Sequence, residues 1–192
     1  MPESRSREPL VWIDCEMTGL DYDNDQIIQI ACFVTGPDLN LLDSEGFEVV
    51  VHQSEETMNA MDDWCRRTHH NSGLTAAVLA SQVTPEMAAE QLLDYIKKHV
   101  PESKKALLAG NTVHADRAFL RRKPYNRVIE HLHHRILDVS TIKEAARRWS
   151  SDDVLKGSPQ KKGMHEAKTD ILESIEEARY YRDTLFTPKP RE

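Results

Sequence analysis

The stretch LVWIDCE at residues 10–16 is typical of a buried β-strand that carries charge near one end. Apolar side chains dominate it, and Asp14 and Glu16 are two residues apart. Because side chains alternate between the two faces of a strand, both carboxylates are expected on one face. Unpaired charges in apolar surroundings are costly, and Mg²⁺ or Mn²⁺ prefers such oxygen ligands, so the pair is a candidate metal site, although two carboxylates alone are a weak signal. The alternative is an exposed strand end without a metal.

Apolar runs of strand length predict four further strands along the chain. Residues 26–34 and 47–51 are expected to form an antiparallel meander with the first strand, because short turns rich in Asp, Asn and Gly separate them. Residues 106–109 and 135–139 predict the fourth and fifth strands, each next to a helical pattern. This order predicts an α/β domain with a mixed five-stranded sheet flanked by helices.

Residue types at helix ends predict where the helices begin. Thr84 followed by Pro85 provides a hydroxyl N-cap with proline in the first turn. Thr141 and Glu144 fit a capping box for a helix that follows the fifth strand. A last helix is predicted over about residues 166–183.

Composition limits the classes of protein that the chain can represent. Its 192 residues suffice for one domain with a hydrophobic core. Proteins that grip long nucleic acids by their phosphates carry basic surfaces, and a net charge of -7 argues against that mode of binding. A short substrate held in one pocket remains compatible with the charge, because bound metal would supply the positive partner.

The cysteines and the hydropathy indicate the expected compartment. Cys15, Cys32 and Cys65 show no CxxC spacing, so the sequence predicts neither a disulfide framework nor a zinc site, but a reducing intracellular setting. No apolar run approaches the ~18 residues of a membrane helix, and the first ten residues have no apolar signal core. We therefore expect a cytoplasmic or mitochondrial protein with no membrane partner.

Three residues further along the chain are candidate partners of the strand carboxylates. Asp116 opens a helix after the fourth strand, where the helix dipole alone would favour an acid. His165 and Asp170 are separated by about 500° of helix rotation, so they do not share a helix face, and His165 is expected to reach the site from a loop. The alternatives are a solvated loop histidine for His165 and an ordinary first-turn acid for Asp170.

Four segments, in the same order and at the same spacing, resemble the oligoribonuclease family. They are residues 11–20 (VWIDCEMTGL), 110–116 (GNTVHAD), 132–141 (LHHRILDVST) and 165–182 (HEAKTDILESIEEARYYR). This family belongs to the DEDDh exonucleases, which have a ribonuclease H-like fold. Other DEDDh exonucleases, such as proofreading or tRNA-trimming types, fit residues 12–20 and 137–141 less well.

The resemblance also implies the domain boundaries. It covers about residues 10–186, which are expected to form one exonuclease domain, with flexible segments at residues 1–9 and 187–192. Within the domain, residues 150–164 are polar and contain Gly157, Pro159 and Gly163, so we expect a mobile loop there.

The activity implied by the resemblance is 3′→5′ exoribonuclease. Short oligoribonucleotides, especially dinucleotides, would be hydrolysed to 5′-mononucleotides. Two divalent cations, Mg²⁺ or Mn²⁺, would be held about 3.5–4 Å apart. The family's four metal-binding acids and its general-base histidine fall on Asp14, Glu16, Asp116, Asp170 and His165.

The resemblance further assigns residues that would hold the base of a short substrate. A base-wedging pair falls on Leu20 and Trp64, since a base stacked on an aromatic ring gains about 1–3 kcal/mol. His69 falls on a position near the substrate. The alternatives are core or helix-face packing for Leu20 and Trp64, and a surface position at a helix end for His69.

A cap on the 5′-phosphate, which limits substrate length in the family, falls on Thr112, Arg135 and Ser140. Local capping or turn bonds are the alternative for the two hydroxyl residues, and a surface ion pair is the alternative for Arg135. The main departure is His134, where the family has a tyrosine that reaches into the partner subunit's site. Histidine can also stack and hydrogen-bond, but its ring is smaller and can titrate.

The resemblance implies a homodimer with composite active sites. Two other functions remain open from the sequence. One is a broader DEDDh exonuclease that acts on longer RNA or DNA. The other is a non-catalytic RNA-binding protein with the same fold, against which the intact set of four acids and His165 argues.

Overall fold

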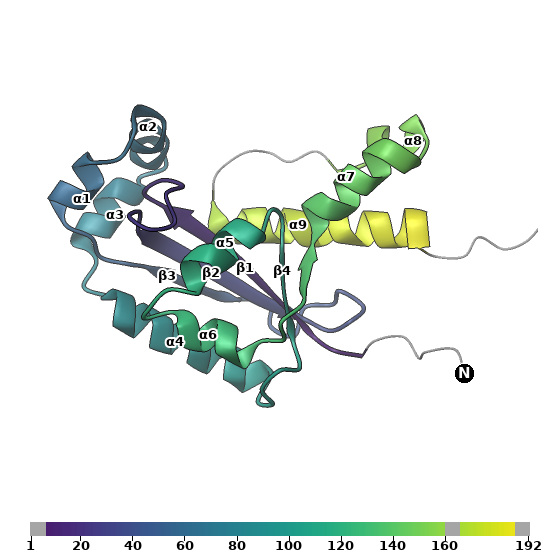
Figure 1. The fold of residues 1–192 in the computed structure, drawn as a ribbon, viewed down its shortest axis with the longest axis horizontal. Coiled ribbons are helices and arrows are strands. Elements are labelled where there is room, and N and C mark those ends of the chain that lie inside the picture. The colour runs from purple at the N-terminus through teal and green to yellow at the C-terminus, as the bar shows by residue number, and fades with distance from the viewer. Residues whose placement is uncertain (1–6, 160–165, 187–192) are drawn as a thin grey trace, which may run out of the picture.

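In this computed structural model, which describes residues 7–159 and 166–186, the chain forms a five-stranded sheet covered by helices (Figure 1). The strand order is β3-β2-β1-β4-β5. The strands are β1 (Leu10–Met17), β2 (Ile27–Thr35), β3 (Phe47–Val50), β4 (Leu107–Gly110) and β5 (Ile136–Asp138). The five strands predicted from apolar runs are therefore confirmed.

Strand β1 lies at the centre of the sheet and makes it mixed. It pairs with β2 in an antiparallel register that joins Asp14 to Ala31 and Glu16 to Gln29. Strand β1 also pairs with β4, and β4 with β5, in parallel registers. Antiparallel hairpins need only short turns, whereas the parallel pairs are connected through helices that cover the sheet. The predicted mixed topology is confirmed.

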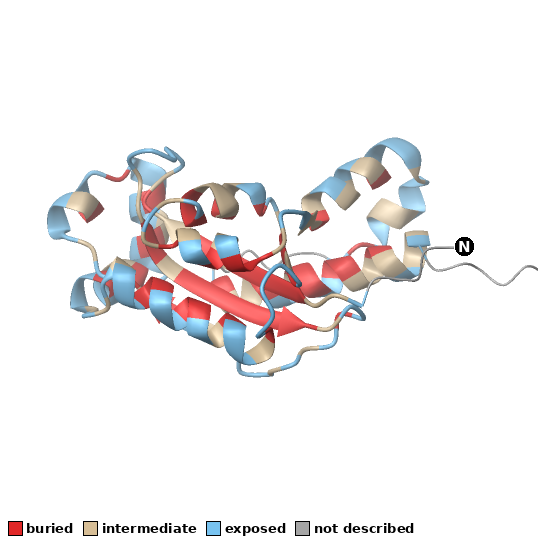
Figure 2. Ribbon diagram, turned by 60° about the horizontal axis from the view of Figure 1, so that its bottom comes forward, coloured by how far each residue is buried: buried red, intermediate tan, exposed pale blue. Residues whose placement is uncertain are grey.

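Helices lie on both faces of the sheet and enclose separate cores (Figure 2). On one face, Val11 and Ile13 of β1 pack with Leu92 of α4. On the other face, Trp12 packs with Ile171 of α9. The helices are α1 (Glu55–Asn59), α2 (Asp63–Asn71), α3 (Leu74–Ala80), α4 (Pro85–His99), α5 (His114–Leu120), α6 (Asn126–His131), α7 (Val139–Trp149), α8 (Asp152–Lys156), α9 (Ala167–Tyr181) and a π-helical end, η1 (Arg182–Phe186).

Two helix predictions are confirmed and one is wrong. Helix α4 begins at Pro85, and the Thr84 hydroxyl accepts a hydrogen bond from the backbone N–H of Met87. Helix α9 covers the last predicted helix. The predicted capping box at Thr141 is wrong, because α7 begins earlier. Its N-cap is Asp138, whose carboxylate accepts from the backbone N–H of Ser140.

Residues 150–159 are not the loop that their composition predicts. They contain the short helix α8, which begins after Ser151 and packs against α7. The remainder of the predicted loop, residues 160–164, lies outside the described residues. No helix in the described part of the chain is long and apolar enough to cross a membrane.

Candidate active site

Three carboxylates from two elements meet at one end of β1. Asp14 and Glu16 share the face of β1 that α9 covers, and Asp170 lies in the first turn of α9. One oxygen of each lies within 4.8 Å of the corresponding oxygens of the other two. The prediction that both strand carboxylates share a face is confirmed. Asp14 and Glu16 are partly buried rather than at an exposed strand end, and Asp170, although it lies in the first turn of α9, lies close to both.

The negative charges of this cluster act on one another. The pKa of Glu16 is raised to about 8 by burial, and by the negative charges of Asp14 and Asp170. A divalent cation among these oxygens would offset the repulsion, and hard carboxylate oxygens are the ligands that Mg²⁺ and Mn²⁺ prefer. The donor set of the cluster therefore fits a divalent metal.

Asp116 adds a fourth carboxylate beside the cluster. It lies in the first turn of α5 and is only 6% exposed, so it is not a solvated acid at a helix end. Its Oδ1 accepts a hydrogen bond of 2.9 Å from the backbone N–H of Cys15, between Asp14 and Glu16 in the chain. Burial and the charge of Asp14 raise the pKa of Asp116 well above its usual range. The fold thus brings four predicted acids to the end of β1.

The predicted general base, His165, lies outside the described residues. The next described residue is Glu166, which is the N-cap of α9. Asp170, a member of the acid cluster, follows four residues after Glu166.

His69 is buried beside the acid cluster. It is 3% exposed, in the last turn of α2, so the alternative of a surface histidine at a helix end is wrong. Its Nε2 lies 3.0 Å from the carbonyl oxygen of Met17, and its Nδ1 lies 4.0 Å from Oε2 of Glu16. His69 therefore links α2 to the end of β1 next to a candidate metal ligand.

Leu20 and Trp64 are exposed apolar side chains. Leu20 follows β1 and is 74% exposed, and Trp64 lies in the first turn of α2 and is 58% exposed. The core half of the alternative is wrong for both residues, whereas its helix-face half fits Trp64, which lies on α2. Leu20 lies three residues after Met17, and Trp64 lies on the same helix as His69, which contacts Met17. Both exposed apolar side chains are therefore available to contact a substrate.

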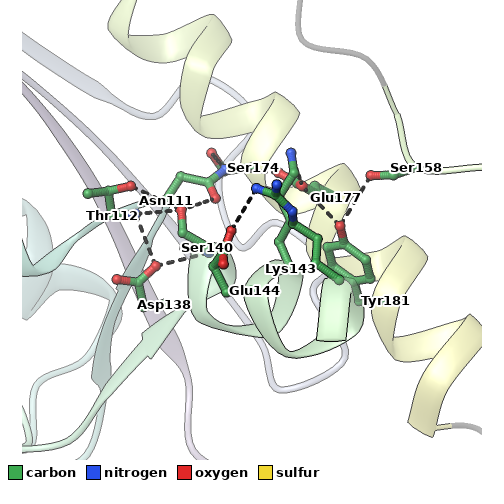
Figure 3. Close-up of polar contacts among 11 residues, drawn as sticks. Asn111, Thr112, Asp138, Ser140, Lys143, Glu144, Ser158, Ser174, Glu177 and Tyr181 are labelled. Atoms are coloured by element: carbon green, nitrogen blue, oxygen red, sulfur yellow. Dashed lines mark hydrogen bonds and ion pairs between the residues drawn. The ribbon is translucent and has the colours of Figure 1, made fainter. Parts of the chain in front are cut away.

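The hydroxyls of Thr112 and Ser140 lie 3.0 Å apart (Figure 3). Thr112 has a φ of 55°, an unfavourable region for a β-branched residue, and its backbone N–H donates to Oδ1 of Asp138 and to the hydroxyl of Ser140. Both hydroxyls are therefore engaged in hydrogen bonds, but these join segments 28 to 29 residues apart and are not the local capping or turn bonds of the alternative. Arg135 is exposed. Its guanidinium forms no ion pair with an acid in residues 7–159 and 166–186, so these residues do not support the alternative of a surface ion pair.

His134, the departure from the family pattern, is also exposed. Its ring lies against that of His133, with centroids 4.2 Å apart. Because the ring remains open to solvent, it can contact a molecule outside the subunit.

A buried polar network behind Thr112 and Ser140 was not predicted from the sequence. Ser140 donates to the side-chain oxygen of Asn111, whose amide donates to the hydroxyl of Ser174 and to Glu177 (Figure 3). Glu177 is 2% exposed, and Lys143 lies 3.2 Å from its carboxylate. Glu177 could have been suspected because it falls on the inward face of the predicted last helix, but its partners come from distant segments.

Several known proteins are similar in sequence to almost the whole of this chain. A family model described as exonuclease, of the ribonuclease T type, matches residues 11–178. The mitochondrial oligoribonuclease of Saccharomyces cerevisiae is 45% identical over 97% of this chain and 72% of its own length. The oligoribonuclease of Rhodococcus jostii is 46% identical over 96% of this chain and 91% of its own length. A mouse mitochondrial oligoribonuclease is 45% identical over 95% of the chain and 76% of its own length.

Solved structures share the fold at much lower identity. Exonuclease I of Escherichia coli, in complex with an oligonucleotide, matches with a TM-score of 0.70 and 14% identity, over 93% of this chain and 42% of that one. Exonuclease I of Methylocaldum szegediense matches with a TM-score of 0.65 and 17% identity, over 92% of this chain and 41% of that one. The chain therefore spans about two fifths of the length of these larger proteins. The match over more than nine tenths of this chain confirms the predicted ribonuclease H-like α/β fold.

Proposed function

The chain belongs to the oligoribonuclease family of exonucleases, and from this premise we propose how its residues hydrolyse short RNA. Relatives at about 45% identity over nearly the whole chain make it a metal-dependent 3′→5′ exoribonuclease that acts on oligoribonucleotides. The substrates that we propose are the shortest ones, especially dinucleotides, with 5′-mononucleotides as products.

The observation that carries the proposal is the meeting of Asp14, Glu16 and Asp170 within 4.8 Å. We propose that these three acids and Asp116 hold two divalent cations, Mg²⁺ or Mn²⁺. When bound, such ions polarise the phosphodiester and make a nearby water more acidic. Burial, together with the negative charges of Asp14 and Asp170, raises the pKa of Glu16, and a divalent cation at this carboxylate would favour its ionised form, so Glu16 would release its proton on metal binding.

The proton and bond changes follow from this arrangement. His165, with a reference pKa near 6.5, accepts the proton of the attacking water. The water oxygen forms a bond to the terminal phosphorus, and the bond from phosphorus to the 3′-oxygen of the preceding nucleotide breaks. The leaving oxygen takes up a proton, and a 5′-mononucleotide is released.

Substrate binding is proposed on both sides of the acid cluster. Leu20 and Trp64 would hold a base between an alkyl side chain and an indole, with His69 beside the sugar-phosphate. Thr112, Arg135 and Ser140 would cap the 5′-phosphate. The exposure of Leu20, Trp64 and Arg135, and the surface position of the Thr112 and Ser140 hydroxyl pair, support these roles.

We also propose a homodimer in which His134 reaches the partner's site. Support comes from exposed apolar side chains around the sheet edge at β5, including Ile136, Trp149 and Phe186. Ile142, Trp149 and Phe186 line one hollow of about 320 Å³ there. A second copy of this chain would cover these apolar side chains. Sedimentation at micromolar concentration tests it: a monomer would contradict the dimer.

For the compartment, we propose a reducing cellular setting, cytoplasmic or mitochondrial. The relatives include proteins named mitochondrial as well as bacterial ones, and Cys15, Cys32 and Cys65 are free and buried.

The decisive experiment compares hydrolysis of a 5′-labelled dinucleotide with that of a twenty-nucleotide RNA, with Mg²⁺, with Mn²⁺ and with a chelator. We expect the dinucleotide to be strongly preferred and the chelator to abolish turnover. Equal rates on both lengths would favour the broader exonuclease. Binding without turnover in either metal would favour the non-catalytic RNA-binding alternative.

A further inference from the structure

The loop that carries Leu20 is held by hydrogen bonds although its tip is exposed. Thr18 and Gln26 close it, with the backbone N–H of Thr18 donating 2.9 Å to the carbonyl of Gln26. The carboxylate of Asp25 accepts from the Thr18 hydroxyl at 2.7 Å and from the backbone N–H of Asp21 at 2.8 Å. A Cβ at Gly19 would stand 2.4 Å from this carboxylate, so the loop has no room for a side chain there.

Helix α5 and the residues after it contact this loop from outside. Nη1 of Arg122 donates to two backbone carbonyls of the loop, those of Tyr22 and Asp25, each at 2.8 Å. The ring of Tyr22 packs edge-on against Phe119, with centroids 5.5 Å apart. Phe119 is itself buried in the core, so these contacts tie the loop to a rigid part of the molecule.

The same helix also holds the other end of the segment. Asp116 in the first turn of α5 accepts from the backbone N–H of Cys15, five residues before Leu20. Phe119 in the last turn of α5 and Arg122, two residues after the helix, contact the chain two to five residues after Leu20. Leu20 therefore lies on a segment held at both ends by α5 and the residues directly after it, and α5 also carries a candidate metal ligand.

We propose that Arg122 is a positioning residue that sets the place of Leu20 relative to the acid cluster. The inference rests on the proposed contact between Leu20 and a substrate base. A guanidinium suits this task because it is planar and can donate to two acceptors with little loss of side-chain freedom. Without Arg122 the exposed loop tip keeps its internal bonds but loses its hydrogen bonds to the region of α5.

The test uses Arg122→Gln, with Arg121→Gln as the matched control. Arg121 is the adjacent residue and exposed, and its side chain makes no hydrogen bond or ion pair with the described residues. We expect Arg122→Gln to raise KM for a dinucleotide about tenfold, with kcat and the affinity for Mn²⁺ unchanged, and Arg121→Gln to leave all three unchanged. Arg122→Lys should restore part of KM. A KM equal to that of Arg121→Gln, or a parallel loss of kcat and Mn²⁺ affinity, would overturn the proposal.

A double-mutant cycle tests whether Arg122 acts through Leu20. In a Leu20→Ala background, Arg122→Gln should change KM much less than it does in the parent chain. An undiminished effect would overturn the proposed connection.

A spin label gives a readout that needs neither RNA nor metal. A nitroxide on Leu20→Cys can be attached selectively, because the three native cysteines are buried. The label should become more mobile in Arg122→Gln and stay unchanged in Arg121→Gln. An unchanged spectrum in Arg122→Gln would show that Arg122 does not restrain the loop that carries Leu20. A mobile label with unchanged KM would overturn the role of Leu20, and with it the positioning role of Arg122.

Discussion

Asp170 and Glu177 lie two turns apart on the same side of α9, yet their surroundings are opposite. Asp170 meets Asp14 and Glu16, so negative charge gathers around it. Glu177 is surrounded by donors: the amide of Asn111 at 3.1 Å, the hydroxyl of Tyr181 at 3.4 Å and the ammonium of Lys143 at 3.2 Å.

The difference distinguishes partly buried acids that could hold a cation from a buried acid whose partners come from the protein itself. A buried carboxylate that receives hydrogen bonds and a counter-charge is satisfied by the protein and stabilises the fold. Carboxylates gathered against one another repel, and a proton or a divalent cation among them would offset that repulsion. Glu16 is such a carboxylate: burial raises its pKa, and the negative charges of Asp14 and Asp170 raise it further.

Asp14→Ala tests whether the acid cluster binds metal, and it should have the largest effect. We expect it to abolish Mn²⁺ binding and to reduce dinucleotide turnover by about a thousandfold or more, since the ions stabilise charge in the transition state. Unlike a typical buried substitution, it should not lower the melting temperature of the metal-free protein, because it removes a repelling charge. Calorimetric titration with Mn²⁺, turnover and thermal melting measure the three effects.

The control for Asp14→Ala is Asp94→Ala on α4, an exposed acid away from the cluster. It should leave all three quantities unchanged. Normal Mn²⁺ affinity in Asp14→Ala would show that the cluster is not the metal centre.

His165→Ala separates metal binding from proton transfer. Mn²⁺ affinity should stay within about twofold, whereas kcat should fall by about 10²–10⁴, the usual contribution of a general base. Single-turnover hydrolysis of a dinucleotide provides the measurement. Near-normal turnover would remove His165 from the proposed mechanism.

Glu177→Ala tests whether the hydrogen-bonded carboxylate of Glu177 stabilises the fold. It should lower the free energy of unfolding by about 2–3 kcal/mol, because the buried amide of Asn111 loses an acceptor and the packing around α9 opens. Urea unfolding measures it. Lys143→Ala is the matched variant, and its cost should be smaller because the Lys143 side chain is 45% exposed. Equal and negligible costs for both would mean that the network adds no stability.

The pH dependence of stability provides a smaller effect. Because the pKa of Glu16 is raised from 4.5 to about 8 in the fold, its contribution to stability is fully present below pH 4.5 and is lost as the pH rises through about 8. The melting temperature of the chelated protein should therefore fall from pH 6 to pH 8, and the gain on adding Mg²⁺ should be larger at pH 8. A gain independent of pH would contradict the proposed exchange of protons for metal.

The smallest expected effect is that of His134→Tyr. If this exposed ring contacts RNA, tyrosine should raise dinucleotide activity by a few-fold, since a larger ring stacks over more of a base. His134→Phe serves as the control for the hydroxyl group. Unchanged KM and kcat in both variants would mean that the position does not touch the substrate.

The sequence pattern predicted the strands well and the short helices poorly. Alternation and apolar runs are local properties, so β1, β2 and β4 could be located from the chain alone. The start of α7 was missed because its cap is Asp138, an acid at the end of a strand, and not the hydroxyl of Thr141. No element was predicted at α1, α2 or α3, where helices of five to nine residues give too few turns for a clear period.

That Asp14 and Glu16 share a face follows from the amino-acid sequence, because side chains alternate between the two faces of a strand. Only the tertiary structure decided that Asp170 comes within 4.8 Å of them, that Asp116 is buried against the backbone of Cys15, and that Glu177 is neutralised by Lys143. These contacts join segments that are up to 156 residues apart. Their geometry depends on how helices pack across the sheet, and no local pattern of residues contains that information.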